Sequence, residues 1–151
     1  MSGKKYISIL NDVLGPIMRG PSSSHTAGSY RIGKLVRSLL GEDPSHVRLT
    51  MDPAGSMAPT LQQLGVDTAF VTGAMGWSML DEDYPSAVVR ATELGVRFDF
   101  EVAPLEHSDH PNAMWIEAEG VGGSVVRTGA ESIGGGLIRF THIEAWSVLL
   151  T

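Results

Sequence analysis

Apolar side chains recur at steps of three and four residues between positions 26 and 40. The apolar members of this pattern are Ile32, Leu35, Val36, Leu39 and Leu40, and basic residues stand between them. Because this spacing brings the apolar side chains onto one side of a helix, it predicts an amphipathic helix that begins at Thr26 or Ala27. Gly41, directly after the last apolar position, predicts its end.

A second helix is expected at residues 84–94. The acidic residues 81–83 suit the positive N-terminal end of its dipole, and Gly95 suits its C-terminal end. Residues 5–14 also carry apolar side chains at helix-compatible spacing, and the segment that follows has the Gly-Pro punctuation of a loop.

Alternation of polar and apolar residues predicts a strand at 46–52, and further strands follow late in the chain. The later strands are expected at residues 97–103, 113–118, 123–128, 137–140 and 143–149. Residues 53–65 show no clear pattern, and residues 68–73 are interpreted as a short buried strand or turn. Two helices followed by late strands predict an α+β fold with a mixed or antiparallel sheet and helices on one face.

The chain has 151 residues, and 42% of them are hydrophobic, which is enough for the core of one ordinary domain. No internal repeat or linker divides it, so residues 1–151 are expected to form a single domain. The formal charge of −6 and the absence of a basic run argue against nucleic acid and anionic membranes as partners. No apolar stretch reaches the length of a membrane span, so we expect a cytoplasmic protein.

The densest polar segment is GPSSSHT at residues 20–26, just ahead of the first predicted helix. Its candidate ligand-binding residues are Ser22, Ser23, Ser24, His25 and Thr26. Hydroxyls, an imidazole and the unpaired N–H groups of a helix N-terminus together suit a carboxylate. The commoner arrangement is a plain helix cap, with Ser24 or Thr26 as the cap and His25 in a satisfied polar pocket.

A second polar segment, EHSDHPN, occupies residues 106–112. His107 and His110 lie on an extended loop, so helical metal-ligand spacing does not apply and no native metal is expected. Asn112 can donate and accept hydrogen bonds at once, which suits a carboxylate or hydroxyl. A third segment has three successive glycines, Gly134, Gly135 and Gly136, and predicts close backbone approach to another chain or ligand, or else a tight turn.

Four segments share an order and spacing with a known family. They are DVLGPIM at residues 12–18 running into GPSSSHTAG at 20–28, GS at 55–56, HPN at 110–112 and SIGGG at 132–136. In these segments the chain resembles the beta subunit or beta domain of bacterial iron-sulfur L-serine dehydratases, and the resemblance covers nearly the whole chain.

The resemblance implies a fold similar to the allosteric substrate-binding domain of some phosphoglycerate dehydrogenases. It also implies an alpha subunit that holds a 4Fe-4S cluster, one iron of which acts on the leaving β-hydroxyl. The chain itself has no cysteine, so no cysteine-held cluster is expected on it. By position in the family motifs, His25 and His110 are the expected catalytic residues and Asn112 an expected substrate contact.

Two departures from the family accompany this match. Many relatives extend the beta chain with a regulatory ACT domain, whereas this sequence stops at Thr151, so we expect a chain without that domain or a truncated sequence. The family also shows a Gly-His-Gly-Thr-Asp run, where this chain aligns as QLGVD at residues 63–67. Leu64 and Val66 then replace a histidine and a threonine that face the substrate, which favours a more apolar substrate than serine.

The first functional hypothesis is a lyase subunit, active only with a cysteine-bearing alpha chain, that removes water with ammonia release from L-serine or a more apolar β-hydroxy amino or hydroxy acid. A different class of function is a non-catalytic domain that senses an amino acid or anion. A third hypothesis is an assembly subunit with a decayed site. Purified without its partner, the chain is expected to expose an apolar patch or to form a homodimer.

Overall fold

The computed structural model describes residues 15–106, 108–144 and 146–150. Within them, six strands form one sheet in the order β2-β1-β3-β4-β5-β6. The strands are β1 (Pro44–Met51), β2 (Arg97–Val102), β3 (Ala113–Gly120), β4 (Val125–Gly134), β5 (Leu137–Ile143) and β6 (Trp146–Leu150). β1 and β2 run parallel and every other neighbouring pair is antiparallel, so the sheet is mixed.

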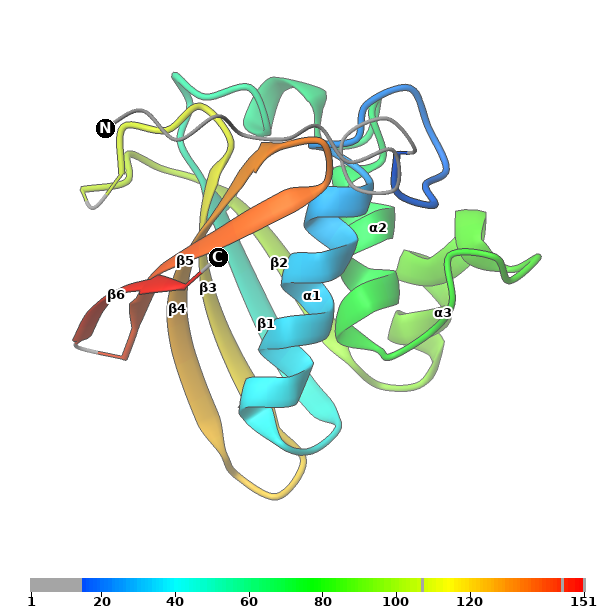
Figure 1. Ribbon diagram of the computed structural model, residues 1–151. Helices are drawn as coiled ribbons and strands as arrows, with labels where there is room; N and C mark the ends of the chain where they lie inside the picture. The colour runs from blue at the N-terminus through cyan, green and yellow to red at the C-terminus, as the bar shows by residue number, and fades with distance from the viewer. Residues whose placement is uncertain (1–14, 107, 145, 151) are drawn as a thin grey trace.

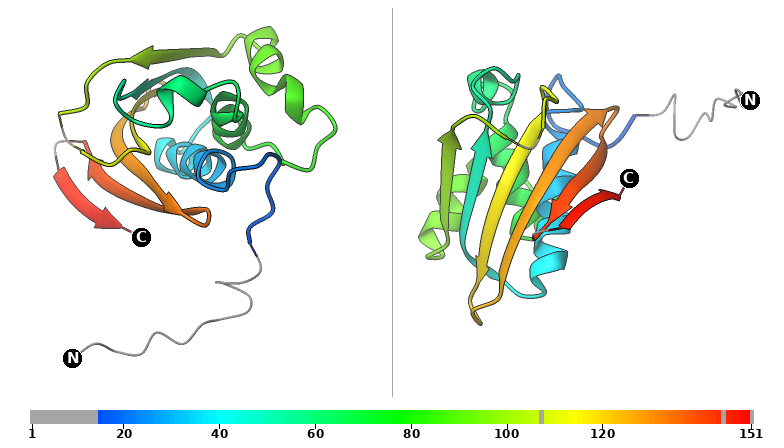
Figure 2. Two further views of the ribbon diagram at one scale, coloured as in Figure 1. Left: turned by 90° about the horizontal axis from the view of Figure 1, so that it is seen from above. Right: turned by 90° about the vertical axis from the view of Figure 1, so that its left-hand side faces the viewer.

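The described helices all lie on one side of this sheet, and none of them lies on the opposite side (Figures 1 and 2). They are α1 (Ala27–Leu40), α2 (Val66–Ala74), α3 (Ala87–Glu93) and the short 3₁₀ helices η2 (Ala58–Thr60) and η3 (Tyr84–Ser86). Two parallel neighbouring strands cannot be joined by a tight turn. The connection from β1 to β2 therefore crosses over the sheet and carries α2 and α3 onto the covered face.

One apolar core fills the space between the helices and the sheet. Its fully buried side chains include Ile32 and Val36 of α1, Phe70 of α2, Leu49 of β1 and Ile116 of β3. These strand residues alternate with polar residues that face the other side, as the period of two along a strand requires. Burial of this apolar area is the main force that holds the helices on the sheet.

The backbones of α1 and α2 touch where the helices cross. A Cβ atom on Gly33 would lie 2.3 Å from the carbonyl oxygen of Phe70, and one on Gly73 would lie 2.1 Å from that of Tyr30. No side chain fits at either position. The two glycines thus allow a closer approach of the helices than any larger residue would.

The first predicted helix is confirmed: α1 ends at Leu40, and Gly41 follows in the left-handed conformation, with its N–H bonded to the carbonyl of Arg37. The helix predicted at residues 84–94 is confirmed as η3 followed by α3, and Gly95 likewise has positive φ. The α+β class, the mixed sheet and its predicted strands are confirmed as well. The helix-compatible segment at residues 5–14 lies outside the described residues.

The interpretation of residues 68–73 as a strand or turn was wrong, because they lie within helix α2. Nearly every residue of this helix is buried, including Val66, Phe70 and Val71. A helix that is buried on all sides shows no amphipathic period, so its pattern is indistinguishable from that of a buried strand.

The sheet face away from the helices carries ion pairs. Arg48 lies 3.0 Å from Glu101 and 3.0 Å from Glu117, and the His46 ring lies 2.7 Å from Asp99. Oppositely charged side chains of neighbouring strands thus pair on this open face, where such pairs contribute little to stability.

None of the described helices is long and apolar enough to cross a membrane.

Candidate functional site

The His25 ring is buried, with 7% of the residue exposed, at the end of the loop that leads into α1. Its Nδ1 lies 2.8 Å from the hydroxyl of Ser22 and 3.1 Å from that of Ser24. Its Nε2 lies 3.4 Å from both the carbonyl oxygen and the hydroxyl of Ser56. The imidazole thus joins the serine loop to the segment that follows β1.

The direction of these hydrogen bonds follows from their partners. The Ser56 hydroxyl donates to Oδ1 of Asn112, and the amide nitrogen of Asn112 donates to the carbonyl of Ser132 at 3.2 Å. A hydroxyl has one proton, so Ser56 has only lone pairs left for His25, and its carbonyl can only accept. This arrangement favours the His25 proton on Nε2 and leaves Nδ1 to accept from Ser22 or Ser24.

The ends of three strands hold this run of polar groups in place. The Ser56 N–H donates to the carbonyl of Pro111 at 2.7 Å, which ties the segment after β1 to the start of β3. The Ser132 N–H donates to the Asn112 carbonyl at 3.1 Å, which ties β3 to β4. His25 and its partners therefore meet at one end of the sheet, although they are far apart in sequence.

Asp52 organises the loops around this end of the sheet. Its carboxylate accepts from the N–H of Leu105 at 2.9 Å and from that of Ala54 at 2.8 Å. These bonds, that to Leu105 above all, hold the pKa of Asp52 below its ordinary value. The carboxylate thereby fixes the two loops that carry Ser56 and His110.

Helix α1 packs directly on β4 beside the site. A Cβ atom on Gly28 would lie 2.1 Å from the Ser132 hydroxyl oxygen and 2.9 Å from its Cβ. Ser132 is fully buried, and its hydroxyl makes no hydrogen bond with the residues that the structure describes. Gly28 is therefore required for the first turn of α1 to rest on the sheet.

His110 lies next to this run rather than within it. Its Nδ1 accepts from the N–H of Asn112 at 3.1 Å, and its own N–H donates to the Ser108 hydroxyl at 3.1 Å. The Ser108 hydroxyl donates in turn to the Glu131 carboxylate at 2.6 Å, which also pairs with Arg139. Burial raises the pKa of Glu131. Hydrogen bonds from Ser108 and Arg139, together with nearby positive charge, lower it by more, so the pKa lies below its ordinary value.

Of the residues predicted for the site, the structure brings together Ser22, Ser24, His25 and Asn112, with His110 beside them. The hydroxyl of Thr26 instead donates to the Ser22 carbonyl at 2.8 Å, and Thr26 has no exposed surface. The carbonyl of Ser23 accepts from the Gly28 N–H at 2.8 Å. No side-chain cap bond is made to α1, so the capping part of the plain alternative is wrong, whereas its other part, His25 in a satisfied polar pocket, agrees with the contacts of the ring. The N–H groups of Thr26 and Gly28 are already bonded within the loop.

Leu64 and Val66 occupy different environments. Leu64 is half-buried in the turn before α2, with its carbonyl close to Gly20 of the serine loop. Val66 has no exposed surface and belongs to the apolar core. Only Leu64 therefore has surface that a ligand on this chain's exterior would contact.

The three successive glycines form the turn between β4 and β5, and all three have positive φ. Positive φ at both Gly135 and Gly136, between paired residues, is typical of a two-residue hairpin turn. A Cβ atom on Gly136 would lie 2.7 Å from Cγ of Pro16, and the Gly136 carbonyl accepts from Arg31 at 2.6 Å. The close approach at Gly136 is thus to this chain itself, while the space beside Gly134 and Gly135 is open.

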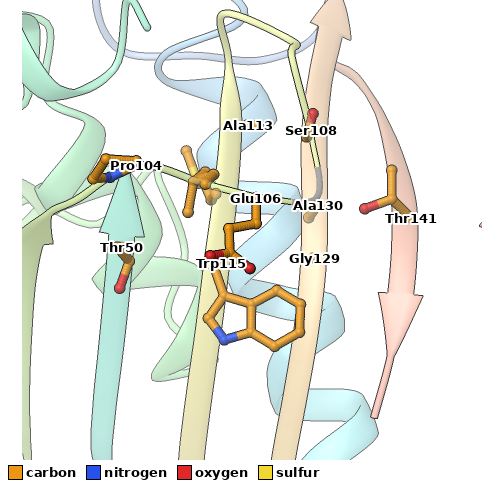
Figure 3. Close-up of a pocket in the computed structure, with 11 residues that line it drawn as sticks. Thr50, Pro104, Glu106, Ser108, Ala113, Trp115, Gly129, Ala130 and Thr141 are labelled. Carbon is orange, nitrogen blue, oxygen red and sulfur yellow. The ribbon is translucent and has the colours of Figure 1, made fainter. Parts of the chain in front are cut away.

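Besides a cavity over Glu131 and Arg139, two cavities flank the loop that carries His110. One, of about 220 Å³, lies beside His110, Pro111 and Gly55, close to the Ser56 end of the site. The other, of about 350 Å³, lies on the open sheet face over Trp115 and Gly129, and the loop at Pro104, Glu106 and Ser108 covers it (Figure 3). The smaller cavity is the one that borders the predicted site.

The sequence motifs did not point to Glu131, and they gave Ser56 and Ser108 only as parts of longer segments. Glu131 is the one acidic residue in β4, and this is the sequence signal that could have found it. In the structure it is 5% exposed, which is rare for a glutamate without partners. Among the described residues, no group of three histidine, aspartate or glutamate side chains could hold a metal ion. His107 lies outside the described residues.

Comparison with known proteins gives two curated relatives, although no protein-family model matches the chain. A probable L-serine dehydratase beta chain from Bacillus subtilis (strain 168) is 37% identical over 147 residues, or 97% of this chain and 64% of the relative. An L-serine dehydratase beta chain from Peptoniphilus asaccharolyticus is 31% identical over 137 residues, or 91% of this chain and 61% of the relative. The chain thus spans less than two thirds of the length of either relative. Over nearly all of its own length, this chain is similar in sequence to L-serine dehydratase beta chains.

Proposed function

We propose that this chain is the beta part of a heteromeric lyase that removes water from L-serine or from a related, more apolar β-hydroxy amino or hydroxy acid. One observation carries the proposal: His25, Ser56 and Asn112 form a single hydrogen-bonded run, and Gly55 and Pro111, next to Ser56 and Asn112 in the chain, line a cavity. Its residues are those of the motifs shared with L-serine dehydratase beta chains. The direction of its bonds suits a substrate that carries a carboxylate and a hydroxyl.

His25 is the residue in this run best suited to meet a substrate. Both contacts of its Nε2 are 3.4 Å long, at the outer limit of a hydrogen bond, whereas its Nδ1 is firmly bonded to Ser22. A substrate oxygen that replaces Ser56 at Nε2 gains a good hydrogen bond at little cost. From that position the imidazole can give or take a proton, the role for which histidine is most often used.

The overall reaction needs a proton removed from the α carbon and a hydroxyl lost from the β carbon. For an amino acid the product is an enamine, which tautomerises to an imine, and water then releases ammonia to leave a keto acid. The part of this chain is to hold the carboxylate and hydroxyl and to exchange a proton at His25. Asn112 orients the run through its bonds to Ser56 and Ser132.

A 4Fe-4S cluster is proposed to be held by a separate alpha subunit. This chain has no cysteine and so offers none of the thiolates that usually ligate such clusters. When bound, the cluster supplies a Lewis-acidic iron that polarises the leaving hydroxyl. The residues of this chain fit beside such a group as polar neighbours, not as ligands.

A non-catalytic sensor is the second candidate, and the burial of His25 favours it. With 7% of the residue exposed and partners at both ring nitrogens, the imidazole also suits a polar pocket that holds an anion without turnover. Both functions would use the same loop. They differ in whether product forms.

The test is anaerobic co-purification with a cysteine-bearing alpha chain, followed by assay of L-serine and a panel of β-hydroxy acids. We expect keto acid to form only with both chains, and this chain alone to be colourless and inactive. Stoichiometric iron and sulfide on the isolated chain would refute the division of roles. Amino-acid binding without turnover in the assembled complex would support the sensor instead.

A further inference from the structure

We infer that Glu131 is a positioning residue for His110 and acts through the hydroxyl of Ser108. The inference rests on the proposed function for its consequence in catalysis, but its structural part does not. Glu131 lies on β4, where it is 5% exposed, and Arg139 stands directly opposite on β5. The Arg139 Nε donates to Glu131 Oε2 at 2.8 Å, and a second nitrogen of the same guanidinium contacts this oxygen.

The other carboxylate oxygen of Glu131 determines how Ser108 is oriented. Ser108 donates its hydroxyl proton to Oε1 at 2.6 Å. An ionised carboxylate can only accept, so this proton has no alternative direction. The lone pairs of the Ser108 oxygen are then left for the N–H of His110, which donates to it at 3.1 Å.

The same geometry fixes the His110 ring. Its Nδ1 accepts from the N–H of Asn112 at 3.1 Å, so the neutral imidazole must carry its proton on Nε2. The backbone N–H of His110 is thus bonded to Ser108, which precedes it, and its ring is bonded to the backbone N–H of Asn112, which follows it. Through Ser108, Glu131 thereby holds the turn in which the Asn112 N–H meets Nδ1 and selects the tautomer that a reactive His110 would present.

Charge pairing with Arg139 does not by itself explain the contacts of Glu131. Its cavity of about 530 Å³ is lined by Glu106, Ser108, Asp109, His110, Glu131 and Arg139. Arg139 alone would satisfy the charge of Glu131, yet the carboxylate keeps one oxygen for Ser108. A glutamine at this position keeps the shape but can turn an NH₂ group toward Ser108, which removes the fixed direction of the chain of bonds.

The experiment uses nitrogen-15 NMR of the histidine rings in this chain, with His110 assigned from a His110→Asn variant. The variants are Glu131→Gln, Ser108→Ala and Ser108→Thr. Glu117→Gln is the matched control, because Glu117 is also a strand carboxylate paired with arginine on the same face of the sheet, but its side chain is 33% exposed, against 7% for Glu131. We expect a single Nε2–H tautomer of His110 at alkaline pH in the parent, the control and Ser108→Thr, and a tautomer mixture in Glu131→Gln and Ser108→Ala.

An unchanged His110 spectrum in folded Ser108→Ala or Glu131→Gln would overturn the inference. If Glu131→Gln fails to fold, the pair Ser108→Ala and Ser108→Thr still decides it, because only the second keeps the hydroxyl. In the complex with the alpha chain, kcat is expected to fall about tenfold in Glu131→Gln while KM changes little, since the loss is one of orientation. A parent complex without any turnover would contradict the proposed function and leave the tautomer result standing.

Discussion

Ser56 donates its hydroxyl proton to the side-chain oxygen of Asn112, a residue 56 positions later in the chain. This bond determines what both residues can offer to a third partner. The Ser56 oxygen has only lone pairs left for His25, and the Asn112 nitrogen is left to donate to Ser132. A local change at Ser56 therefore affects three other residues.

Replacing Ser56 by alanine should lower the free energy of unfolding by about 1 kcal/mol, because the half-buried Asn112 oxygen loses its donor. Chemical denaturation of the two chains measures this difference. Ser45→Ala is the control: that hydroxyl donates to the carbonyl of Glu119 at 3.1 Å but lies at an exposed position. Equal stability changes in the two variants would show that the bond to Asn112 has no special weight.

Replacing His25 by alanine should lower turnover of the assembled complex by roughly a hundredfold or more if the imidazole transfers a proton. The melting temperature of the complex should stay close to that of the parent. His46→Gln is the control, because His46 is a half-buried histidine bonded to Asp99 on the open sheet face. Loss of folding together with loss of activity would instead assign His25 to the structure alone.

Replacing Gly28 by alanine should destabilise the chain by about 1–3 kcal/mol through overpacking against Ser132. The double variant Gly28→Ala with Ser132→Gly should regain part of this loss, because it removes both atoms that the new methyl group would meet. Gly15→Ala is the control, since among the described residues no atom lies within 4 Å of the position of its Cβ. Thermal unfolding of the parent, the two single variants Gly28→Ala and Ser132→Gly, the double variant and the control tests the coupling, and strictly additive effects would contradict it.

Leu64 and Val66 should respond differently to restoration of the family's polar residues. Leu64→His places a hydrogen-bonding group at a partly exposed position and should raise activity on L-serine relative to other hydroxy acids by about tenfold. Val66→Thr puts a hydroxyl into the apolar core and should mainly lower stability, by about 1–3 kcal/mol. Substrate ranking and denaturation of each single variant and of the double variant separate these effects. A ranking that the double variant leaves untouched would mean that neither residue sets substrate choice.

Protonation of Glu131 should destabilise the fold at acid pH. Its pKa lies below the ordinary value of 4.5, so its ionised form contributes stability above that pH, and the contribution is lost as the pH falls through the lower folded value. Urea denaturation at a series of pH values should show a smaller acid loss for Glu131→Gln than for the parent. Parallel plots of unfolding free energy against pH for the two chains would show that the pKa of Glu131 is the same in the folded and the unfolded state.

Much of this structure could be predicted from the sequence because its elements are amphipathic. Helix α1 has an exposed and a buried side, and β1 alternates between the covered face and the open face. Helix α2 could not be predicted, because burial on all sides removes the period that separates a helix from a strand. The position of Val66 in the core was hidden for the same reason.

The site was predictable only in its motif-bearing residues. His25 and Asn112 stand in distinctive segments, whereas Ser108 and Glu131 are common residues whose role arises from their contacts. Those contacts depend on how β4 is placed against the loop before β3, and no local pattern encodes that placement. The glycine turn shows the same limit, since only the fold reveals that Gly136 rests on Pro16.

The wide sequence separation within the site has a consequence for how the protein folds. Ser22, Ser56, Asn112 and Ser132 come together only after the chain has closed loops of tens of residues, each at an entropic cost. Hairpins such as β4–β5 close over short distances and can form earlier. The polar run should therefore be among the last features to form during refolding, so that competence to bind lags behind the appearance of secondary structure.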